Sequence, residues 1–257
     1  MQLVYPNQIF ATTHGAAEVH ISYLQIYCEM VGDLLNPNMD SALSIREKSG
    51  VVFVEGLSKS RVTSAQDVYA LLDLGNNNRA TASTLMNATS SRSHAALIVT
   101  ISFPSEEGND AQAVPSSSVR TNKRESSLVL IDLAGSERST AAGGHYTRLE
   151  EAKAINLSLS ALGNCMNALA EGRSHIPYRD SKLTRLLQGS LGGGSRTSVI
   201  VNISPGEDEK GEVLNSLKFA SRASRVQVVA KVSRCVERII MMPSNIDSPS
   251  PLFSSMC

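Results

Sequence analysis

The sequence predicts an α/β domain of three layers, in which a mixed sheet is flanked by helices. Runs of apolar and β-branched residues, which are typical of strands, alternate along the chain with helical patterns. Several of these runs are nearly continuous in apolar residues, as in strands that are covered on both faces. The chain has 257 residues, of which 42% are hydrophobic. This is enough for one large domain with a buried core.

The strands and helices are placed by these patterns. The strands are expected at Val19 to Tyr27, Ala95 to Phe103, Ser127 to Ile131 and Thr197 to Ile203. The helices are expected at Ser64 to Leu74, Glu150 to Glu171, from Asp180 or Ser181 to Gly192, and from about Glu209 to Val226. Ser64 would cap the first helix, and Gly75 would stop it.

The remaining segments divide the chain into a domain and a tail. Pro104 to Arg124 is rich in Ser, Gly and charge, and is predicted to form a long surface loop. The domain would span residues 1–228 and the tail residues 229–257, of which 243–257 would be disordered because they are rich in Ser and Pro. No heptad pattern continues beyond Val226, so no coiled coil is predicted, and the oligomeric state is not encoded.

Several classes of protein are excluded by composition. No apolar run approaches the ~18 residues of a membrane helix, and no Lys or Arg precedes Arg46, as a secretory signal would require. The four cysteines form no CxxC pair, which argues against zinc and favours free thiols in a reducing compartment. We therefore expect a soluble cytoplasmic protein with neither a membrane nor a nucleic-acid partner.

The net charge of zero conceals a basic C-terminal half. Residues 173–196 and 218–238 each carry five or more Lys and Arg against one acidic residue. This excess indicates either a positive face for an acidic partner or a merely solvated basic face. Three of the cations recur every three residues on the third helix and would share one exposed face, namely Arg179, Lys182 and Arg185.

Two motifs carry candidate chemistry. In LVLIDLAGSER, Asp132 ends a hydrophobic strand and Gly135 follows three residues later. An aspartate in this position can hold Mg²⁺, and the glycine N–H can reach a terminal phosphate, although DxxG is also common in plain turns. In NATSSRSH, the hydroxyls of Ser90, Ser91 and Ser93 would suit Mg²⁺ and phosphate oxygens, or would simply cap a turn.

These two motifs resemble switch I and switch II of the kinesin motor domain. Switch I corresponds to Asn87-x-x-Ser90-Ser91-Arg92-Ser93-His94, and switch II to Asp132-Leu133-Ala134-Gly135-Ser136-Glu137. Other stretches resemble further parts of this family in the same order: SYLQIYCEMVGDLLNP, the relay helix LEEAKAINLSLSALGNCMNALAEG, the microtubule-facing HIPYRDSKLTRLLQGSLGG, and the last core helix LNSLKFASRASRV. The resemblance covers about residues 18–228 and implies a kinesin motor core, which is similar to P-loop nucleotide hydrolases.

The resemblance implies a role for each matching residue. Ser91 would bind Mg²⁺ directly and Asp132 would hold it through water, while Asn87, Ser90 and Gly135 would lie beside the phosphates of ATP. Arg92 and Glu137 would form an ion pair that positions the attacking water and couples hydrolysis to movement of the switches. Arg179, Lys182 and Arg185 would contact the acidic surface of tubulin, which places the protein on microtubules of the cytoskeleton.

The sequence departs from the family in one important respect. It contains no GxxxxGK[ST] loop, the segment that cradles the nucleotide phosphates. Met1 would fall after this loop, so we expect an N-terminally truncated motor core that lacks early strands of the sheet. Such a chain would be marginally stable and would hydrolyse ATP poorly or not at all. A smaller departure is Cys28, which stands where the family usually has Asn.

Three functions remain in competition. The first is a microtubule motor with ATP hydrolase activity, here incomplete. The second is a non-catalytic microtubule-binding protein without a working nucleotide site. The third is a GTPase, but the nearest match to its NKxD motif is Asn122-Lys123-Arg124-Glu125, which ends in Glu and precedes a strand.

Overall fold

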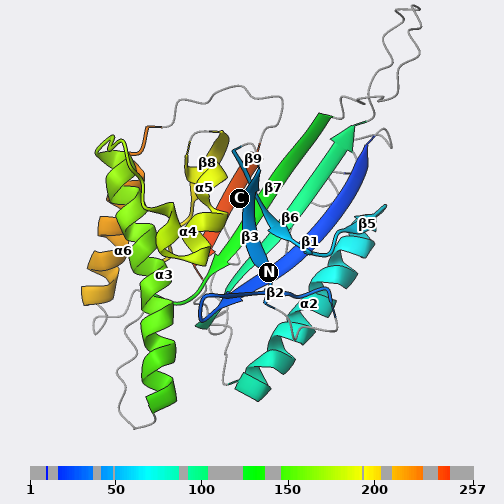
Figure 1. Cartoon of the computed structure of the whole chain (residues 1–257), viewed down its shortest axis with the longest axis horizontal. Coiled ribbons are helices and arrows are strands. Elements are labelled where there is room, and N and C mark those ends of the chain that lie inside the picture. The colour runs from blue at the N-terminus through cyan, green and yellow to red at the C-terminus, as the bar shows by residue number, and fades with distance from the viewer. Residues whose placement is uncertain are drawn as a thin grey trace, which may run out of the picture.

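The computed structural model describes residues 10, 17–36, 42–48, 50–86, 92–103, 124–136, 146–192, 194–203, 210–227 and 237–243. These residues form a central sheet with helices on both faces (Figure 1). Within them, no helix is both long and apolar enough to cross a membrane. Cys28 and Cys165 are free thiols, as predicted.

Seven strands form the central sheet, in the order β2-β1-β6-β7-β9-β8, with β5 paired to β1. Their bounds are β1 Glu18–Tyr27, β2 Met30–Asp33, β5 Ser60–Val62, β6 His94–Phe103, β7 Arg124–Leu133, β8 Ser195–Val199 and β9 Glu237–Pro243. The pairs from β2 to β7 are antiparallel, whereas β9 is parallel to both β7 and β8. The sheet is therefore mixed, as predicted. A separate hairpin pairs β3, Ser44–Lys48, with β4, Val51–Glu55.

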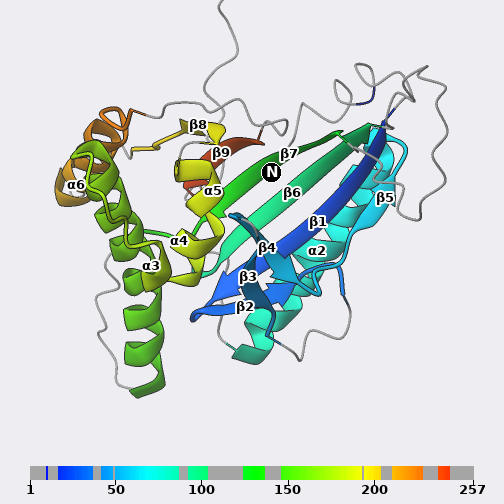
Figure 2. The ribbon, with the colours of Figure 1, turned by 45° about the horizontal axis from the view of Figure 1, so that its top comes forward.

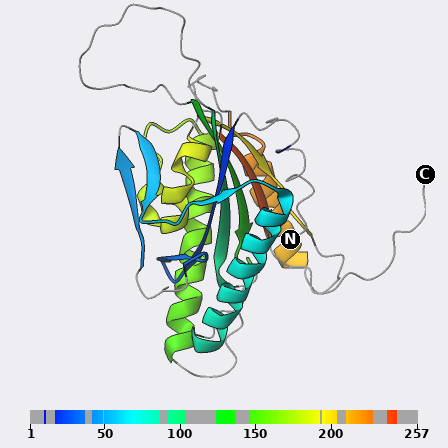
Figure 3. The same ribbon diagram turned by 90° about the vertical axis from the view of Figure 1, so that its right-hand side faces the viewer.

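Helices cover the two faces of the sheet and enclose two cores. The helices are α2 Ala65–Met86, α3 Tyr146–Ala170, α4 Lys182–Leu186, α5 Gln188–Leu191, α6 Lys210–Ala223 and the short 3₁₀ helix η2 Tyr178–Asp180. On one face, Val68 and Leu72 of α2 pack against β1, β6 and β7. On the other face, Leu162 of α3 and Leu183 of α4 pack against the same strands. Figure 3 shows the sheet nearly edge-on between cyan α2 and green α3. The three-layer arrangement is confirmed.

The predicted elements are present, with changed bounds. The strands expected from Val19, Ala95 and Ser127 are β1, β6 and β7, and α3 and α6 lie where helices were expected. β8 ends at Val199, before the expected end at Ile203. The sequence patterns missed the short strands β2 to β5, because runs of three to five residues give too little periodicity. The loop expected at Pro104 to Arg124 lies outside the described residues, except for Arg124, which begins β7.

The predicted stop at Gly75 is wrong, whereas the predicted cap is confirmed. Ser64 Oγ accepts a hydrogen bond from Asp67 N, and Asp67 Oδ2 accepts one from Ser64 N. This reciprocal pair is a capping box. The helix continues through Gly75 to Met86. Gly75 lies against the ring of Tyr23, so a glycine is needed at this position for close packing.

The predicted third helix is divided into three short pieces. Ser181 adopts an extended conformation between η2 and α4, and its hydroxyl accepts a hydrogen bond from Thr184 N. Of the two predicted starts, Asp180 and Ser181, the structure agrees with Ser181, which is the N-cap of α4. Because α4 begins only at Lys182, Arg179 belongs to η2, so the three predicted cations do not lie along one continuous helix.

The largest difference from expectation lies near the C-terminus. No element was predicted after Val226, yet Glu237–Pro243 forms β9 in the interior of the sheet. Figure 2 shows red β9 between green β7 and yellow β8. Residues 244–257, which were expected to be disordered, lie outside the described residues.

The packing at Gly75 predicts opposite effects for two glycine-to-alanine changes. A Cβ at Gly75 would lie 2.2 Å from Tyr23 Cδ1, and the Tyr23 ring is held by a 3.0 Å hydrogen bond to Asn76. Gly75→Ala should therefore lower the free energy of unfolding by roughly 1–3 kcal/mol. Gly163→Ala in α3 is the control, since its Cβ would meet nothing within 4 Å, and it should gain up to about 1 kcal/mol. Urea unfolding measures both, and a stabilised Gly75→Ala variant would contradict this account.

Candidate functional site

The two predicted switch motifs meet at one end of the sheet. β6 and β7 are antiparallel neighbours, and Ala95 pairs with Asp132. The start of β6 therefore lies beside the end of β7, which brings Arg92 to His94 next to Asp132 to Gly135. Four predicted site residues fall outside the described part of the chain, namely Asn87, Ser90, Ser91 and Glu137.

A buried arginine joins the two motifs. Arg79 in α2 is 8% exposed, and three contacts join its guanidinium to the two motifs. Nε donates to Ser93 Oγ at 3.0 Å, and another nitrogen donates to the Ser93 carbonyl at 2.6 Å. The third contact is an ion pair with Asp132 Oδ2 at 3.2 Å. Arg79 thus holds the end of the first motif against the start of the second.

Arg79 was missed by sequence reasoning. The first helix was expected to stop at Gly75, which left Arg79 in an unassigned segment. The available signal was the helix-compatible sequence beyond that glycine, because a single Gly weakens a helix but does not end it. With α2 continued to Met86, Arg79 is one helical turn beyond Gly75, on the side that faces the sheet.

His94 extends the contact from switch II to the long helix α3. Its Nδ1 accepts a hydrogen bond from Ala134 N at 3.0 Å, so Nε2 carries the proton. Nε2 lies 2.8 Å from Ser158 Oγ and donates to it. Ser158 is a buried residue of α3. One imidazole therefore connects β6, the loop after β7 and the helix.

The surroundings of His94 keep the imidazole neutral. The side chain is 3% exposed, and burial together with the nearby Arg79 cation lowers the pKa of His94 to about 4. A protonated imidazole would also lose the acceptor that binds Ala134 N. The neutral tautomer is thus required by both the electrostatics and the hydrogen bonds.

The other described site residues surround this network. Asp132 is the next-to-last residue of β7, and its side chain is 27% exposed. Gly135 is buried directly after Ala134. Arg92 is half-buried and immediately precedes Ser93. The predicted ion pair of Arg92 with Glu137 stays a prediction, because Glu137 is outside the described residues.

The three predicted track-facing cations differ in their surroundings. Arg179 and Lys182 are exposed. Arg185 is 17% exposed at its side chain and forms a 2.6 Å ion pair with Glu47 of β3. The prediction of one shared exposed face is therefore wrong for Arg185, whose guanidinium holds the β3–β4 hairpin against α4. Glu47 could not be foreseen as its partner, since the two residues are 138 positions apart.

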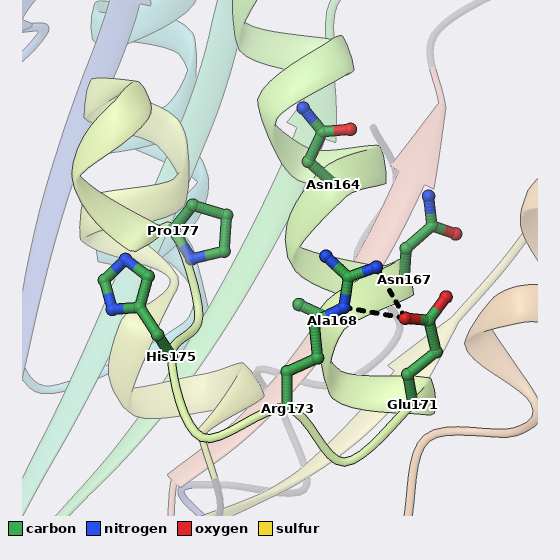
Figure 4. Close-up of a pocket in the computed structure, with 7 residues that line it drawn as sticks. All are labelled: Asn164, Asn167, Ala168, Glu171, Arg173, His175 and Pro177. Atoms are coloured by element: carbon green, nitrogen blue, oxygen red, sulfur yellow. Dashed lines mark hydrogen bonds and ion pairs between the residues drawn. The ribbon is translucent and has the colours of Figure 1, made fainter.

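A polar hollow of about 380 Å³ lies at the C-terminal end of α3 (Figure 4). Its lining residues are Asn164, Asn167, Ala168, Glu171, Arg173, His175 and Pro177. Glu171 and Arg173 pair across part of it at 2.6 Å, but both side chains are more than half exposed, so the pair adds little stability. No predicted nucleotide-site residue lines this hollow.

The lowered pKa of His94 predicts acid sensitivity. An unfolded histidine has an ordinary pKa of about 6.5, so below that pH the unfolded chain binds a proton that the folded chain excludes. Stability should be complete above pH 6.5 and should fall as the pH approaches 4, with a loss of about 2 kcal/mol by pH 5. Urea unfolding from pH 7 to pH 5 measures this. His94→Gln, which cannot gain charge, is the control, and an equally steep decline in that variant would rule out His94 as the cause.

The guanidinium of Arg79 is a planar fork whose separate nitrogens donate to Ser93 and to Asp132. We therefore predict that lysine cannot replace it. Lysine is a single point of charge and cannot bind both the Ser93 carbonyl and the Asp132 carboxylate in the same arrangement. Arg79→Lys should therefore lower the free energy of unfolding by about 1–3 kcal/mol. The matched change at an exposed arginine, Arg61→Lys, should alter it by less than about 0.5 kcal/mol. Equal effects of the two changes on urea unfolding would contradict the proposed importance of the fork.

Known proteins are similar to this chain in sequence and in fold. The kinesin motor domain profile matches residues 5–226. Kinesin-related protein 5 of Dictyostelium discoideum is 44% identical over 232 residues, and the kinesin heavy chain of Gibberella moniliformis is 45% identical over 233 residues. These matches cover 89% and 88% of this chain but only 22% and 24% of the two relatives. A solved structure of a fast kinesin superimposes with a TM-score of 0.76 at 43% identity, covering 88% of this chain and 62% of that one. The chain belongs to the kinesin motor domain family.

Proposed function

We propose that this chain forms the switch-bearing and microtubule-facing part of a kinesin motor, which couples ATP hydrolysis to movement along microtubules. The observation that carries the proposal is the buried network of Arg79, Ser93, His94, Ala134 and Ser158. It joins both switch motifs to the long helix α3. A change at either motif would therefore act directly on that helix.

The nucleotide side of the proposal uses the residues predicted from the family. Asp132 fits a Mg²⁺ site, because it supplies a single, partly exposed carboxylate at the end of a strand. It would hold the ion through water, and Ser91 would bind it directly. Asn87, Ser90 and Gly135 would contact phosphates of ATP, and Arg92 with Glu137 would position the attacking water. Mg²⁺, when bound, would neutralise charge on the phosphates.

The ion pair of Arg79 with Asp132 gives the nucleotide side a definite geometry. Asp132 Oδ2 is taken by Arg79, so the carboxylate cannot rotate freely toward an ion. Arg79 is therefore a positioning residue in this proposal, because it acts on the metal site only through Asp132 and Ser93.

The microtubule side depends chiefly on two cations. Arg179 and Lys182 are exposed and can approach an acidic surface, whereas Arg185 is engaged with Glu47 and Gln188. The backbone N–H of Lys182 donates to Glu29 Oε2 at 2.6 Å, which holds the start of α4 in place. We infer that Arg185 orients the β3–β4 hairpin beside α4 and contributes to microtubule binding indirectly. The protein would act in the cytoplasm, on the microtubule cytoskeleton.

A second candidate function is microtubule binding without catalysis. It is favoured by one observation: the carboxylate of Asp132, the proposed metal residue, is ion-paired with Arg79. A carboxylate that is held by a cation binds Mg²⁺ less readily. A protein of this kind would bind the track through Arg179 and Lys182 irrespective of nucleotide.

Co-sedimentation with microtubules separates the two functions. The full chain is mixed with microtubules at low salt, with either ATP or a non-hydrolysable analogue. Stronger pelleting with the analogue supports the motor, and equal pelleting in both supports the non-catalytic protein. Arg179→Glu should weaken pelleting about threefold to tenfold, because it reverses a charge on the proposed contact surface. Arg61→Glu in β5 is the matched control and should pellet like the unchanged chain. Equal pelleting of the two variants would refute the assignment of Arg179 to the track-facing surface.

A further inference from the structure

The turn between β1 and β2 has a backbone that its residues do not favour. Tyr27 pairs with Met30, so Cys28 and Glu29 alone form the turn. Their φ angles are +48° and +59°, both in the left-handed region. A two-residue hairpin turn with positive φ at both positions is of type I′, which favours Asn and Gly because a Cβ is strained there. Glycine would therefore suit the backbone at Glu29 better than glutamate does.

The side chain of Glu29 leaves this hairpin and reaches α4. Glu29 Oε2 accepts a hydrogen bond of 2.6 Å from the backbone N–H of Lys182, 153 positions later. Figure 2 shows the blue end of the hairpin beside yellow-green α4. The other oxygen, Oε1, is buried and makes no hydrogen bond within the described residues. A glutamate without a partner would turn both oxygens to water, since a buried unpaired oxygen costs free energy. The contact with α4 thus accounts for a side chain that neither the turn nor solvation favours.

Glu29 satisfies an amide that the cap of α4 does not reach. The first N–H groups of a helix have no carbonyl partner within the helix. Ser181 Oγ accepts from Thr184 N, and the Ser181 carbonyl accepts from Arg185 N. The amide of Lys182 takes its acceptor from Glu29, in a different part of the fold. The start of α4 is therefore held from two sides, by its own cap and by the β1–β2 turn.

We propose that Glu29 is a positioning residue for the surface that carries Arg179 and Lys182. Its carboxylate fixes the backbone at Lys182, and so sets the direction in which the exposed Lys182 side chain leaves the start of α4. Glu29 does not bind the acidic partner itself, because a carboxylate would be repelled by it. The link to microtubules rests on the proposed function, whereas the hydrogen bond to α4 does not.

Hydrogen exchange of the full chain is the first test. Glu29→Gly removes the carboxylate and at the same time relieves the turn. The Lys182 amide should then exchange at least about tenfold faster than in the unchanged chain. Cys28→Gly is the matched control, since it makes the same change in the same turn but keeps the carboxylate, and it should leave that amide protected. Unaltered exchange at Lys182 in a folded Glu29→Gly chain would overturn the proposal.

The conservative variant tests whether the side-chain oxygen is responsible. Glu29→Gln keeps an acceptor of the same length without the charge, so exchange at Lys182 should stay within about threefold of the unchanged chain. A loss of protection as large as in Glu29→Gly would count against the acceptor role. Protection of β1 and β6 shows whether each variant is folded. If Glu29→Gly is not, Glu29→Asn takes its place, because Asn also tolerates positive φ and its side chain is one methylene shorter.

Microtubule pelleting separates positioning from charge by the sign of the effect. If Glu29 acted only through its charge, Glu29→Gly would pellet more strongly, because a negative charge beside the cations is lost. Positioning predicts about threefold weaker pelleting, although the same charge is lost. Glu29→Gln should pellet at least as strongly as the unchanged chain, and Cys28→Gly equally. Undiminished pelleting of Glu29→Gly would refute the positioning role. If the unchanged chain does not pellet, the proposed function fails, and exchange at Lys182 decides separately whether Glu29 holds α4.

Discussion

The ion pair and hydrogen bonds of buried Arg79 are the contacts on which the arrangement of the site depends. A guanidinium that is 8% exposed must be compensated, because an unpaired charge in such a place is strongly destabilising. Ser93, directly before β6, and Asp132 in β7 supply that compensation. Burial of the imidazole, together with the same cation, lowers the pKa of His94 and keeps it neutral and able to accept from Ala134 N. The buried charge in α2 therefore contributes to the protonation state of the link between switch II and α3.

The sequence was sufficient for the layers and for the pairing of the two motifs, because long apolar runs and ordered family motifs are strong signals. It was insufficient for the roles of Arg79 and Glu47. The partners of Arg79 lie 14 or more positions away, and the partner of Glu47 lies 138 positions away. Local periodicity does not reveal contacts over such distances in sequence. β9 was missed for a different reason. Its apolar run is only four residues long and lies in a segment bounded by charge and proline, where composition alone indicated a tail.

The microtubule side shows how packing divides residues of one type into separate roles. Arg179 and Lys182 are exposed, whereas the side chain of Arg185 reaches Glu47 in the β3–β4 hairpin. Its ion pair is only partly exposed, so solvent screens it less than it screens the exposed pair of Glu171 with Arg173. Burial, and not charge, thus separates the cation that holds the surface together from the cations that can meet a partner.

The position of Asp132 limits where movement in the site can begin. Its backbone pairs with Ala95 on one side and with Met242 on the other, and its carboxylate is bound by Arg79. Ala134, two residues later, is tied to His94. Residues up to Ala134 therefore form a rigid frame with the sheet. A phosphate signal that reaches α3 through switch II must either start at Gly135, where the absence of a Cβ permits backbone change, or break the His94 contact. Protonation of His94 would break the same hydrogen bond from Ala134 N to His94 Nδ1. Acid and the phosphate signal would therefore act on the same contact.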